Sequence, residues 1–313
     1  MEIFALGRFA AQGAPFTGVV SGTRVGRLTD LLPGLDDAGI PSLFADWDAN
    51  VQGIASAIEA GAELPWNESE LIRLAPLAPP QLFGAGMNYR KHVVDLMVDK
   101  QMSTREEAEA VMDERAASGT PFVFLATPSA ICGPDDDVVL RPDSEESDWE
   151  LELGAVIARP IRNVSREEAL ECVAGWTIVN DLTARNFVPR TDAGPVSVDW
   201  LRSKCAPTYK PTGPYLVPAA CAPDPSEFTI TLRLNGETMQ HESTKDMIFD
   251  VATLISYLSH EVELLAGDVI MTGSPAGNGT HHGRFLREGD VLEGEIAPLP
   301  GMLRNRCVQG VAA

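Results

Sequence analysis

Cysteine is scarce in this chain of 313 residues. The five cysteines, Cys132, Cys172, Cys205, Cys221 and Cys307, form no CxxC pair and are odd in number. A scattered, odd set argues against a disulfide framework and against a structural zinc site. We therefore expect a reducing, cytoplasmic environment.

Positive charge and long apolar runs are also in short supply. Lysine and arginine total 24 against 45 acidic residues, which gives a net charge of −21 and a pI near 4.5. The basic residues are scattered, so neither a nucleic-acid surface nor an anionic-membrane surface is expected. No run of about 18 apolar residues occurs, and residues 1–8 do not begin a signal peptide. A soluble protein is expected, in which an anionic substrate would need local positive charge.

Acidic residues, in contrast, form an informative pattern. The sequence Asp-Trp-Glu-Leu-Glu-Leu occupies residues 148–153, and on a strand Glu150 and Glu152 would share one face. Asp181 arrives from the next segment, 29 residues after Glu152, and would complete an all-oxygen set. Such a set suits Mg²⁺, Mn²⁺ or Ca²⁺ and would relieve the repulsion between like charges. The alternative is a solvated strand face and an unrelated buried aspartate.

The chain divides at a proline-rich segment. Residues 1–74 mix short apolar stretches with one helix-like segment, 51–60, and contain no cluster of reactive side chains. Residues 75–80 hold three prolines, which favour extended backbone and prevent a continuing helix. We predict a small N-terminal domain over 1–74, a linker over 75–80 and a main domain over 81–313.

Within the main domain, turn and capping signals separate short apolar segments. Capping-box patterns predict a charged surface helix over 104–117 and a second helix from Ser165. Asn235-Gly236 predicts a hairpin, and apolar spacing predicts a helix over 251–258. Strands are expected over 121–125, 148–153, 176–181, 229–234, 237–240 and 267–272. Strands outnumber helices, which favours a mixed, β-rich α+β fold over a doubly wound parallel sheet.

Seven motifs in a fixed order carry a family resemblance. They begin at residues 86, 121, 148, 180, 235, 246 and 267, with the sequences Gly-Met-Asn-Tyr-Arg-x-His, Pro-Phe-Val-Phe-Leu, Asp-Trp-Glu-Leu-Glu, Asn-Asp-Leu-Thr-Ala-Arg, Asn-Gly-Glu, Asp-Met-Ile-Phe and Gly-Asp-Val-Ile-Met-Thr-Gly-Ser-Pro. Over roughly residues 80–306 the chain resembles the fumarylacetoacetate hydrolase family, in its acylpyruvase and 2-oxo acid hydrolase branch. The resemblance implies a double-sheet β-roll or barrel core, a variable N-terminal domain and a homodimer.

The resemblance also implies an active site. Glu150, Glu152 and Asp181 would bind one Mg²⁺ or Mn²⁺, and His92 with Asp95 would activate water. Relatives typically have Glu where this chain has Asp95. The implied substrate contacts are Tyr89, Arg185, Lys204, Thr272 and Ser274, of which Arg185 and Lys204 would also stabilise an oxyanion.

Three residues depart from the family pattern. Ala126 stands where many members have Lys, Val188 where a Gln is common, and Asn186 where an Asp is usual. The pocket is therefore expected to be less polar and less cationic than in relatives that bind small dicarboxylates.

Two other features carry simpler interpretations. His281 and His282 are adjacent and would point oppositely on an extended segment, so we interpret them as flexible loop histidines. Cys205 beside Lys204 is interpreted as a packing residue.

The favoured function is a divalent-metal-dependent hydrolase of a C–C bond in an acylpyruvate-type 2-oxo acid or β-diketone, in which a metal-stabilised enolate accepts the electrons. A diketo sugar acid is one special case of such a substrate. The alternatives are a lyase or isomerase of the same fold, namely a decarboxylase, hydratase or enol–keto tautomerase, and a non-catalytic ligand-binding homologue. Residues 93–120 are predicted to form a mobile lid, with a permanently ordered surface helix as the alternative.

Overall fold

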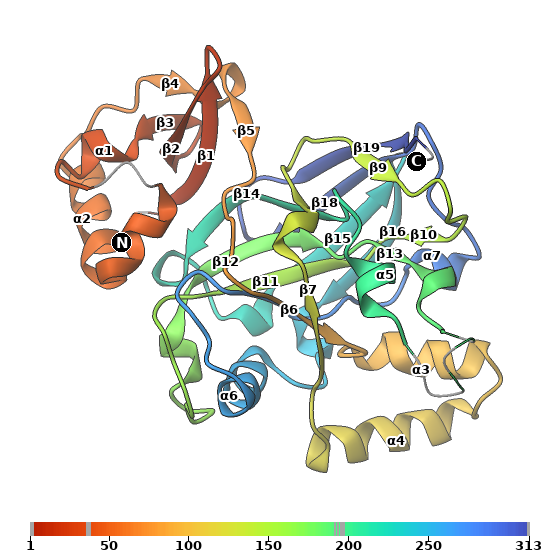
Figure 1. Ribbon diagram of the computed structural model, residues 1–313. Coiled ribbons are helices and arrows are strands. Elements are labelled where there is room, and N and C mark those ends of the chain that lie inside the picture. The colour runs from red at the N-terminus through yellow and green to blue at the C-terminus, as the bar shows by residue number, and fades with distance from the viewer. Residues whose placement is uncertain (1–2, 36–38, 191, 193, 195–197, 312–313) are drawn as a thin grey trace.

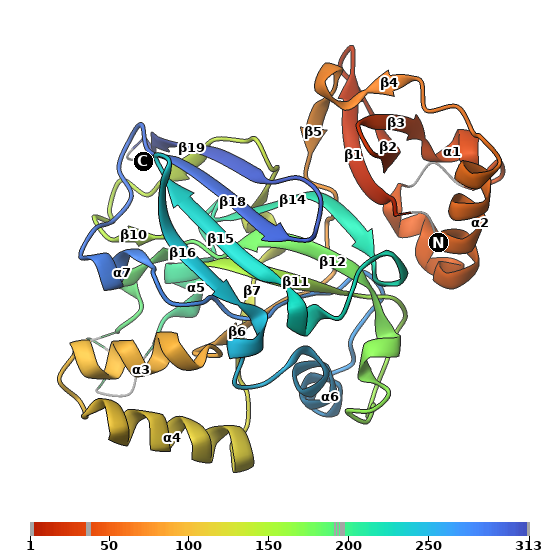
Figure 2. The same ribbon diagram turned by 180° about the vertical axis from the view of Figure 1, so that it is seen from behind.

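The structure is a computed structural model that describes residues 3–35, 39–190, 192, 194 and 198–311. An N-terminal lobe stands beside a larger body made mainly of strands, and a pair of helices covers the end of the body remote from the lobe (Figures 1 and 2). No helix among the described residues is long and apolar enough to cross a membrane.

The N-terminal lobe is an antiparallel meander packed against one main helix. Its elements are β1 (Ala5–Ala11), β2 (Ala14–Ser21), β3 (Arg24–Arg27), α1 (Leu28–Leu31), η1 (Ile40–Asp46), α2 (Trp47–Glu59), β4 (Trp66–Asn67), η2 (Glu68–Glu70) and β5 (Ile72–Leu74). The Asp46 side chain caps α2 by accepting a hydrogen bond from Ala49 N at 3.3 Å. Val51 and Ile54 are buried one turn apart, which confirms a helix over most of 51–60.

The lobe shares a sheet with the body. Strand β1 pairs antiparallel with β14 (Lys210–Pro218), with Leu6 opposite Leu216 and Gly7 opposite Tyr215. The proline-rich segment is packed as well, because Pro76, Leu77 and Pro79 are buried. A domain boundary at residue 74 remains a prediction, and the lobe's sheet is continuous with that of the body.

The strand that carries Glu152 lies near the middle of the main sheet. Its order is β4-β3-β2-β1-β14-β12-β11-β17-β6-β7, with β5 beside β1 and β8 (Ile131–Cys132) beside β14. The body strands are β6 (Leu82–Gly86), β7 (Phe122–Ala126), β11 (Leu151–Ile157), β12 (Val173–Asn180) and β17 (Val269–Met271). Strands β11 and β12 are buried along their whole length, so the pair forms the floor of the body.

A second sheet packs over this floor. Its order is β16 (Glu237–Ser243), β15 (Thr229–Leu234), β18 (Val291–Ala297), β19 (Leu303–Gln309) and β9 (Val138–Leu140). Asn235 and Gly236 have φ angles of 53° and 84°, as a two-residue hairpin requires, and the predicted hairpin is confirmed. A Cβ on Gly294 would lie 2.6 Å from a Leu151 methyl, so this glycine permits the sheets to approach closely. The β-rich α+β prediction and its double-sheet core are confirmed, but the sheets of the described residues do not close into a barrel.

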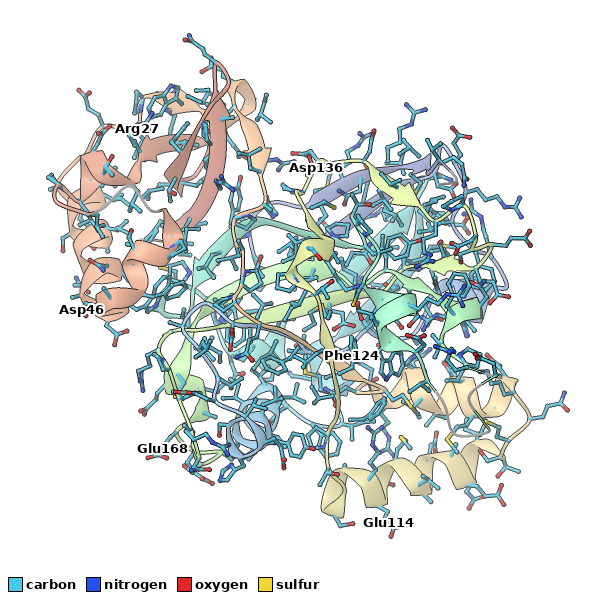
Figure 3. All side chains as sticks on the ribbon, viewed as in Figure 1. Arg27, Asp46, Glu114, Phe124, Asp136 and Glu168 are labelled. Carbon is cyan, nitrogen blue, oxygen red and sulfur yellow. The ribbon has the colours of Figure 1, made fainter. Side chains whose placement is uncertain are left out.

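Five helices beyond the lobe complete the described part of the chain. They are α3 (Arg90–Asp99), α4 (Arg105–Ser118), α5 (Trp200–Lys204), α6 (Val251–Glu261) and α7 (Gly279–His282). Thr104 and Glu107 form the predicted capping box at the start of α4. Val93 and Val94 of α3 pack against Ala108 and Met112 of α4. Figure 3 shows Glu114 on α4, projecting away from the body, whereas Phe124 lies within it.

The helix predicted from Ser165 is wrong. The capping hydrogen bonds exist, since Ser165 Oγ donates to Glu168 Oε2 at 2.7 Å. They are followed only by a turn and the short 3₁₀ helix η4 (Ala169–Cys172), because the chain enters β12 at Val173. The other short elements are η3 (Pro128–Ala130), β10 (Ser147–Asp148), β13 (Thr183–Ala184), η5 (Arg185–Phe187), η7 (Ala219–Cys221), η8 (Pro225–Glu227) and η9 (Thr244–Asp246).

Candidate metal centre and active site

The three predicted ligands come together at the end of the β11–β12 pair. Glu152 lies on β11 opposite Val179, while Glu150 precedes β11 and Asp181 follows β12. Asp181 N donates to Glu150 O at 2.8 Å, which continues the ladder beyond the strands. One carboxylate oxygen from each side chain lies within 4.8 Å of the others, and all three residues are buried. The geometry therefore fits a single small cation with oxygen ligands.

Positive side chains surround these carboxylates. Lys204 Nζ lies 2.5 Å from Glu150 Oε2 and also contacts Asp181 Oδ2, and Arg185 Nη2 donates to Glu150 Oε1 at 2.6 Å. Burial alone would raise the pKa of Glu150, but Arg185 and Lys204 outweigh it and hold that pKa below its usual range. Burial, and then the charge of Asp181, raise the pKa of Glu152 well above its usual value. The two glutamates of one motif thus have opposite electrostatic environments.

Lys210 is a site residue that the sequence did not reveal. It is fully buried, and its Nζ lies 2.8 Å from Asp181 Oδ1. It also donates to the carbonyl oxygens of Leu182 and Tyr209, each at 3.2 Å, and to that of Lys204. Burial lowers the Lys210 pKa and the charge of Asp181 opposes that shift. The only signal was a lysine at the start of an otherwise apolar strand.

Asp148 is the second residue without a predicted role. Its Oδ2 accepts from Arg185 Nε at 2.7 Å, and its Oδ1 accepts from Gly279 N at 2.5 Å. Thr280 N and Oγ1 donate to Oδ2 at 3.2 Å and 3.0 Å. Asp148 is completely buried. It therefore links Arg185, which binds the candidate ligand Glu150, to the start of α7.

The proposed base and its partner lie on α3 but make separate contacts. Asp95 Oδ2 accepts from Lys91 Nζ and its Oδ1 from Arg105 Nη2, both at 2.8 Å, so Asp95 joins α3 to α4. Burial lowers the His92 pKa, while the charge of Glu150 opposes that shift. The His92–Asp95 dyad stays a prediction, because both carboxylate oxygens of Asp95 are bound to cations.

A cavity of about 190 Å³ opens beside His92. It is lined by His92, Asp95, Leu96, Asp99, Lys100, Asn278, Thr280 and His281. The two adjacent histidines are not on an extended segment, and that assumption is wrong: Asn278 caps the short helix α7 and Gly283, at φ 61°, ends it. His281 Nδ1 lies 3.4 Å from Asp99 Oδ2. His281 is thus placed in the wall of the cavity that contains His92.

The remaining predicted substrate contacts differ in whether their hydroxyl groups already have hydrogen-bond partners. The Tyr89 hydroxyl is buried without a hydrogen-bond partner among the described residues, and burial together with Glu152 raises its pKa. Thr272 Oγ1 donates to Leu153 O at 2.9 Å. Ser274 Oγ accepts from Gln240 Nε2 at 2.8 Å. Tyr89 is therefore the one of these three hydroxyls that lacks a partner.

The three departures from the family pattern lie in different settings. Ala126 is buried at the end of β7, Val188 is half-buried, and Asn186 is exposed, where it accepts from Ser144 Oγ at 2.6 Å. Arg185, Lys204 and Lys210 nevertheless place three cations around the carboxylates. The expectation of a less cationic pocket therefore does not extend to the carboxylate centre. Cys205 is half-buried against an apolar cluster, which fits a packing residue.

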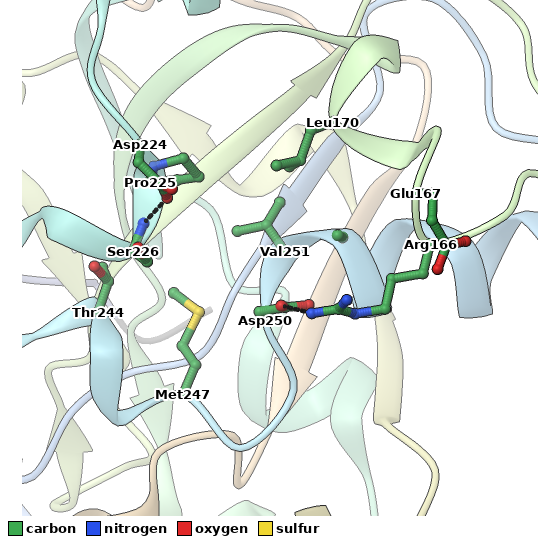
Figure 4. Close-up of a pocket in the computed structure, with 11 residues that line it drawn as sticks. Arg166, Glu167, Leu170, Asp224, Pro225, Ser226, Thr244, Met247, Asp250 and Val251 are labelled. Carbon is green, nitrogen blue, oxygen red and sulfur yellow. Dashed lines mark hydrogen bonds and ion pairs between the residues drawn. The ribbon is translucent and has the colours of Figure 1, made fainter.

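A larger cavity of about 340 Å³ lies elsewhere, between the η4 turn, η8 and the start of α6 (Figure 4). Arg166 Nη2 binds Asp250 Oδ2 at 2.5 Å, and Asp224 Oδ1 accepts from Ser226 N at 2.8 Å. None of the predicted site residues lines this cavity. The chemistry is better placed at the carboxylate cluster.

Comparison with known proteins decides the family. The family described as fumarylacetoacetate (FAA) hydrolase C-terminal matches residues 81–308. The chain belongs to this family. Its motifs, predicted from residue order alone, thus lie in a confirmed fumarylacetoacetate hydrolase domain.

Members with different activities resemble this chain. Human mitochondrial oxaloacetate tautomerase FAHD2B is 36% identical over 248 residues, covering 78% of this chain and 71% of that protein. The 2,4-didehydro-3-deoxy-L-rhamnonate hydrolase of a Sphingomonas species is 33% identical over 291 residues, covering 91% and 90%. The solved maleylpyruvate hydrolase of Sphingobium, in complex with manganese(II) and pyruvate, has a TM-score of 0.74 and 26% identity, covering 98% and 100%. The family is one of enzymes, and both tautomerases and hydrolases belong to it.

Proposed function

We propose that this protein is a divalent-metal-dependent hydrolase that cleaves a C–C bond in an acylpyruvate-type diketo acid. The observation that carries the proposal is the buried cluster of Glu150, Glu152 and Asp181 beside cationic side chains, with a histidine-lined cavity linked to it through Arg185 and Asp148. A hydrolase relative solved with manganese(II) and pyruvate supports it.

The donor set fits Mg²⁺ or Mn²⁺ better than a softer metal. All three side chains offer carboxylate oxygens, and no cysteine or histidine belongs to the cluster. Asp181 Oδ1 is buried, and Lys210 Nζ lies 2.8 Å from it. When bound, the cation would supply a Lewis acid for the oxygens of a 2-oxo acid.

The chain's own residues would bind and polarise the substrate and move one proton. Arg185 presents a planar guanidinium and Lys204 a compact ammonium, and both suit a carboxylate or a developing oxyanion. Neutral His92 would accept a proton from water at a ring nitrogen as that water attacks the carbonyl carbon. Burial favours the neutral ring, because it lowers the His92 pKa. The proton would then go to the carbon that leaves.

An enol–keto tautomerase is the second candidate. The human oxaloacetate tautomerase covers 78% of this chain, and both carboxylate oxygens of Asp95 are bound to Lys91 and Arg105. A tautomerase needs proton transfer between carbon and oxygen but no attacking water. It would therefore tolerate a His92 that lacks a carboxylate partner.

Product analysis separates the two reactions. Protein with Mn²⁺ or Mg²⁺ is incubated with acylpyruvates, diketo sugar acids and enol-oxaloacetate, and pyruvate or other 2-oxo acid products and released carboxylic acid are quantified alongside enol absorbance. Hydrolysis yields equal amounts of 2-oxo acid and carboxylic acid. Loss of enol absorbance without new carboxylic acid would instead identify a tautomerase. The His92→Ala variant controls for contaminating activity.

We also propose a homodimer. Phe122 and Leu125 of β7 and Leu201 of α5 are exposed apolar residues at 41%, 61% and 69%, on neighbouring elements that contact through Phe122 and Trp200. Phe122 and Leu125 lie three residues apart and so on opposite faces of β7, but exposed apolar side chains on neighbouring elements are candidate interaction surfaces. Light scattering should give twice the chain mass of 33.6 kDa. A monomer at micromolar concentration would contradict the proposal.

A further inference from the structure

One face of α3 lines the cavity beside the proposed base. His92, Leu96 and Asp99 are spaced by four and three residues, so they share that face. At 1.5 Å per residue, the seven steps from His92 to Asp99 extend about 10 Å along the helix. The metal-ligand carboxylates do not line this cavity. Its volume of about 190 Å³ gives room for the part of a substrate that extends beyond the reacting carbonyl.

The opposite wall is fixed to the catalytic centre. Asp148 accepts hydrogen bonds from Gly279 N and from Thr280, at the start of α7. A Cβ on Gly279 would lie 2.7 Å from Asp148 Oδ1, so this close approach requires glycine. Asp148 also holds Arg185, and Arg185 binds the ligand Glu150. The position of His281 is thus set by the network that positions a proposed metal ligand.

His281 presents a hydrogen-bonding group at this wall. Its Nδ1 lies 3.4 Å from Asp99 Oδ2, a contact that joins α7 to α3 across the cavity. A carboxylate partner favours a proton on the nearer ring nitrogen, which leaves the other nitrogen for a ligand. His282 packs against Trp149 and against the ring of His281, and it does not line the cavity. The adjacent histidine therefore provides a matched control.

The charges on the walls limit what can bind. Asp95 and Asp99 line the cavity with a single lysine, Lys100. Among the described residues, the lining contains no arginine and only this one lysine, so it offers neither a guanidinium nor a pair of ammonium groups to hold a carboxylate. An alkyl chain would meet only one aliphatic side chain, Leu96. A neutral chain with hydroxyl groups suits these walls best.

We propose that His281, held by Asp99, is a specificity-determining residue that binds a hydroxyl group on the part of the substrate remote from the metal ligands. This inference rests on the proposed function, because it assumes that the diketo or 2-oxo end binds at the carboxylate cluster. The substrate class would then be 2-oxo or diketo acids with a hydroxylated chain.

The test compares three acylpyruvates of equal chain length whose remote parts are hydroxylated, purely alkyl or ended by a carboxylate. The wild type should favour the hydroxylated compound by about tenfold in kcat/KM, mainly through KM, as expected for one hydrogen bond. His281→Ala should remove that preference and His281→Gln should restore part of it. Asp99→Asn should weaken the preference, and His282→Ala should leave it unchanged.

Equal kcat/KM for the hydroxylated and alkyl compounds, or a preference for the carboxylate-ended one, would overturn the inference. So would an equal loss in His281→Ala and His282→Ala. If no compound is cleaved, the hydrolase proposal fails, and calorimetric titration of the Mn²⁺-loaded protein with 2-oxo acids having the same three chains replaces the kinetic test. A His281-dependent preference for the hydroxylated ligand would then uphold the inference, and its absence would refute it.

Discussion

The strand floor of the site, formed by β11 and β12, and its helical rim, formed by α3, α4 and α7, differ in how far their charged side chains are buried. On the floor, Asp148, Glu150 and Asp181 are buried and each contacts a cationic side chain. On the rim, the ion pair of Arg90 with Asp113 and the contact of His281 with Asp99 are largely open to solvent. Loss of one partner from a buried pair costs several kcal/mol, whereas exposed pairs contribute little.

The comparison indicates that the floor and the rim are suited to different roles. Replacement of one charged residue on the floor leaves its partner unpaired, so the floor suits the chemistry that family members share. The rim can exchange side chains at small cost, so it suits the recognition of different substrates. Variants of the two regions should therefore differ in size of effect and in the quantity that changes.

The largest effect is expected from a floor ligand. Asp181→Asn removes one anionic donor and leaves Lys210 without its carboxylate, so Mn²⁺ affinity should fall by more than about 100-fold, above the range for indirect partners. Calorimetry measures the affinity, and the thermal shift on adding Mn²⁺ provides a second readout. Asp99→Asn, on the rim, is the control and should retain wild-type affinity. Unchanged binding in Asp181→Asn would refute the ligand assignment.

His92 lies on the rim, on α3, but its proposed role is in the chemistry at the floor. His92→Ala should lower kcat by about 10²–10⁴-fold and leave Mn²⁺ affinity nearly intact, since a general base acts on water. Asp95→Ala and Arg105→Ala extend the comparison. If Asp95 orients His92, only Asp95→Ala lowers turnover and Asp95→Glu retains more of it. Equal effects of Asp95→Ala and Arg105→Ala would leave Asp95 as a helix tether.

Lys210 tests whether a floor cation stabilises the fold. Lys210→Met removes one of the two cations that contact the buried Asp181 and leaves several carbonyl oxygens without their donor, so the free energy of unfolding should decrease by about 3–5 kcal/mol. Urea denaturation measures the change. Lys100→Met, at the rim, should alter stability by no more than about 0.5 kcal/mol. Similar values for the two variants would remove the distinction between the regions.

The pH profile should report the partial burial of the rim base. Burial lowers the His92 pKa, and the base must be unprotonated to accept a proton. Activity should therefore fall as pH decreases through a midpoint below about 6.5, the ordinary histidine value, and remain level at neutral pH. The midpoint is read from kcat/KM against pH. An acid limb centred above that value would contradict this role.

The smallest expected effect concerns backbone motion. Residues 93–120 should exchange amide hydrogens faster than β11 and β12, and Mn²⁺ with oxalate should slow that exchange if the segment acts as a lid. Mass spectrometry of peptides from both regions gives the comparison. Strong and equal protection of 93–120 with and without oxalate would identify a permanently ordered helical pair.

The sequence was sufficient for much of the floor because its signals are local. Alternation places Glu150 and Glu152 on one face, and the ordered motifs bring Asp181 to them through an antiparallel pair. The roles of Lys210 and Asp148 depend on partners that are distant in sequence, so no local pattern could reveal them. The sequence likewise gives no sign that a single lysine at the start of a strand is buried.

The predicted helices show where local rules fail. The capping box at Thr104 does begin a helix, but the equivalent bonds at Ser165 lead only to a turn because β12 follows within a few residues. His281 and His282 were assumed to lie on extended backbone, whereas Asn278 caps a helical turn there. Whether a capped segment becomes a helix is decided by the distance to the next packed element.

The pairing of β1 with β14 covers a sheet edge of the body. Tyr215 and Leu216 present backbone groups that β1 occupies, and Arg73 of the lobe binds Asp135 of the body at 2.6 Å. A chain shortened to begin at residue 75 would carry the complete family domain but leave that stretch as a bare sheet edge. Bare edges recruit strands from other molecules. A protein that begins at residue 75 is therefore expected to associate with itself more readily than the full chain.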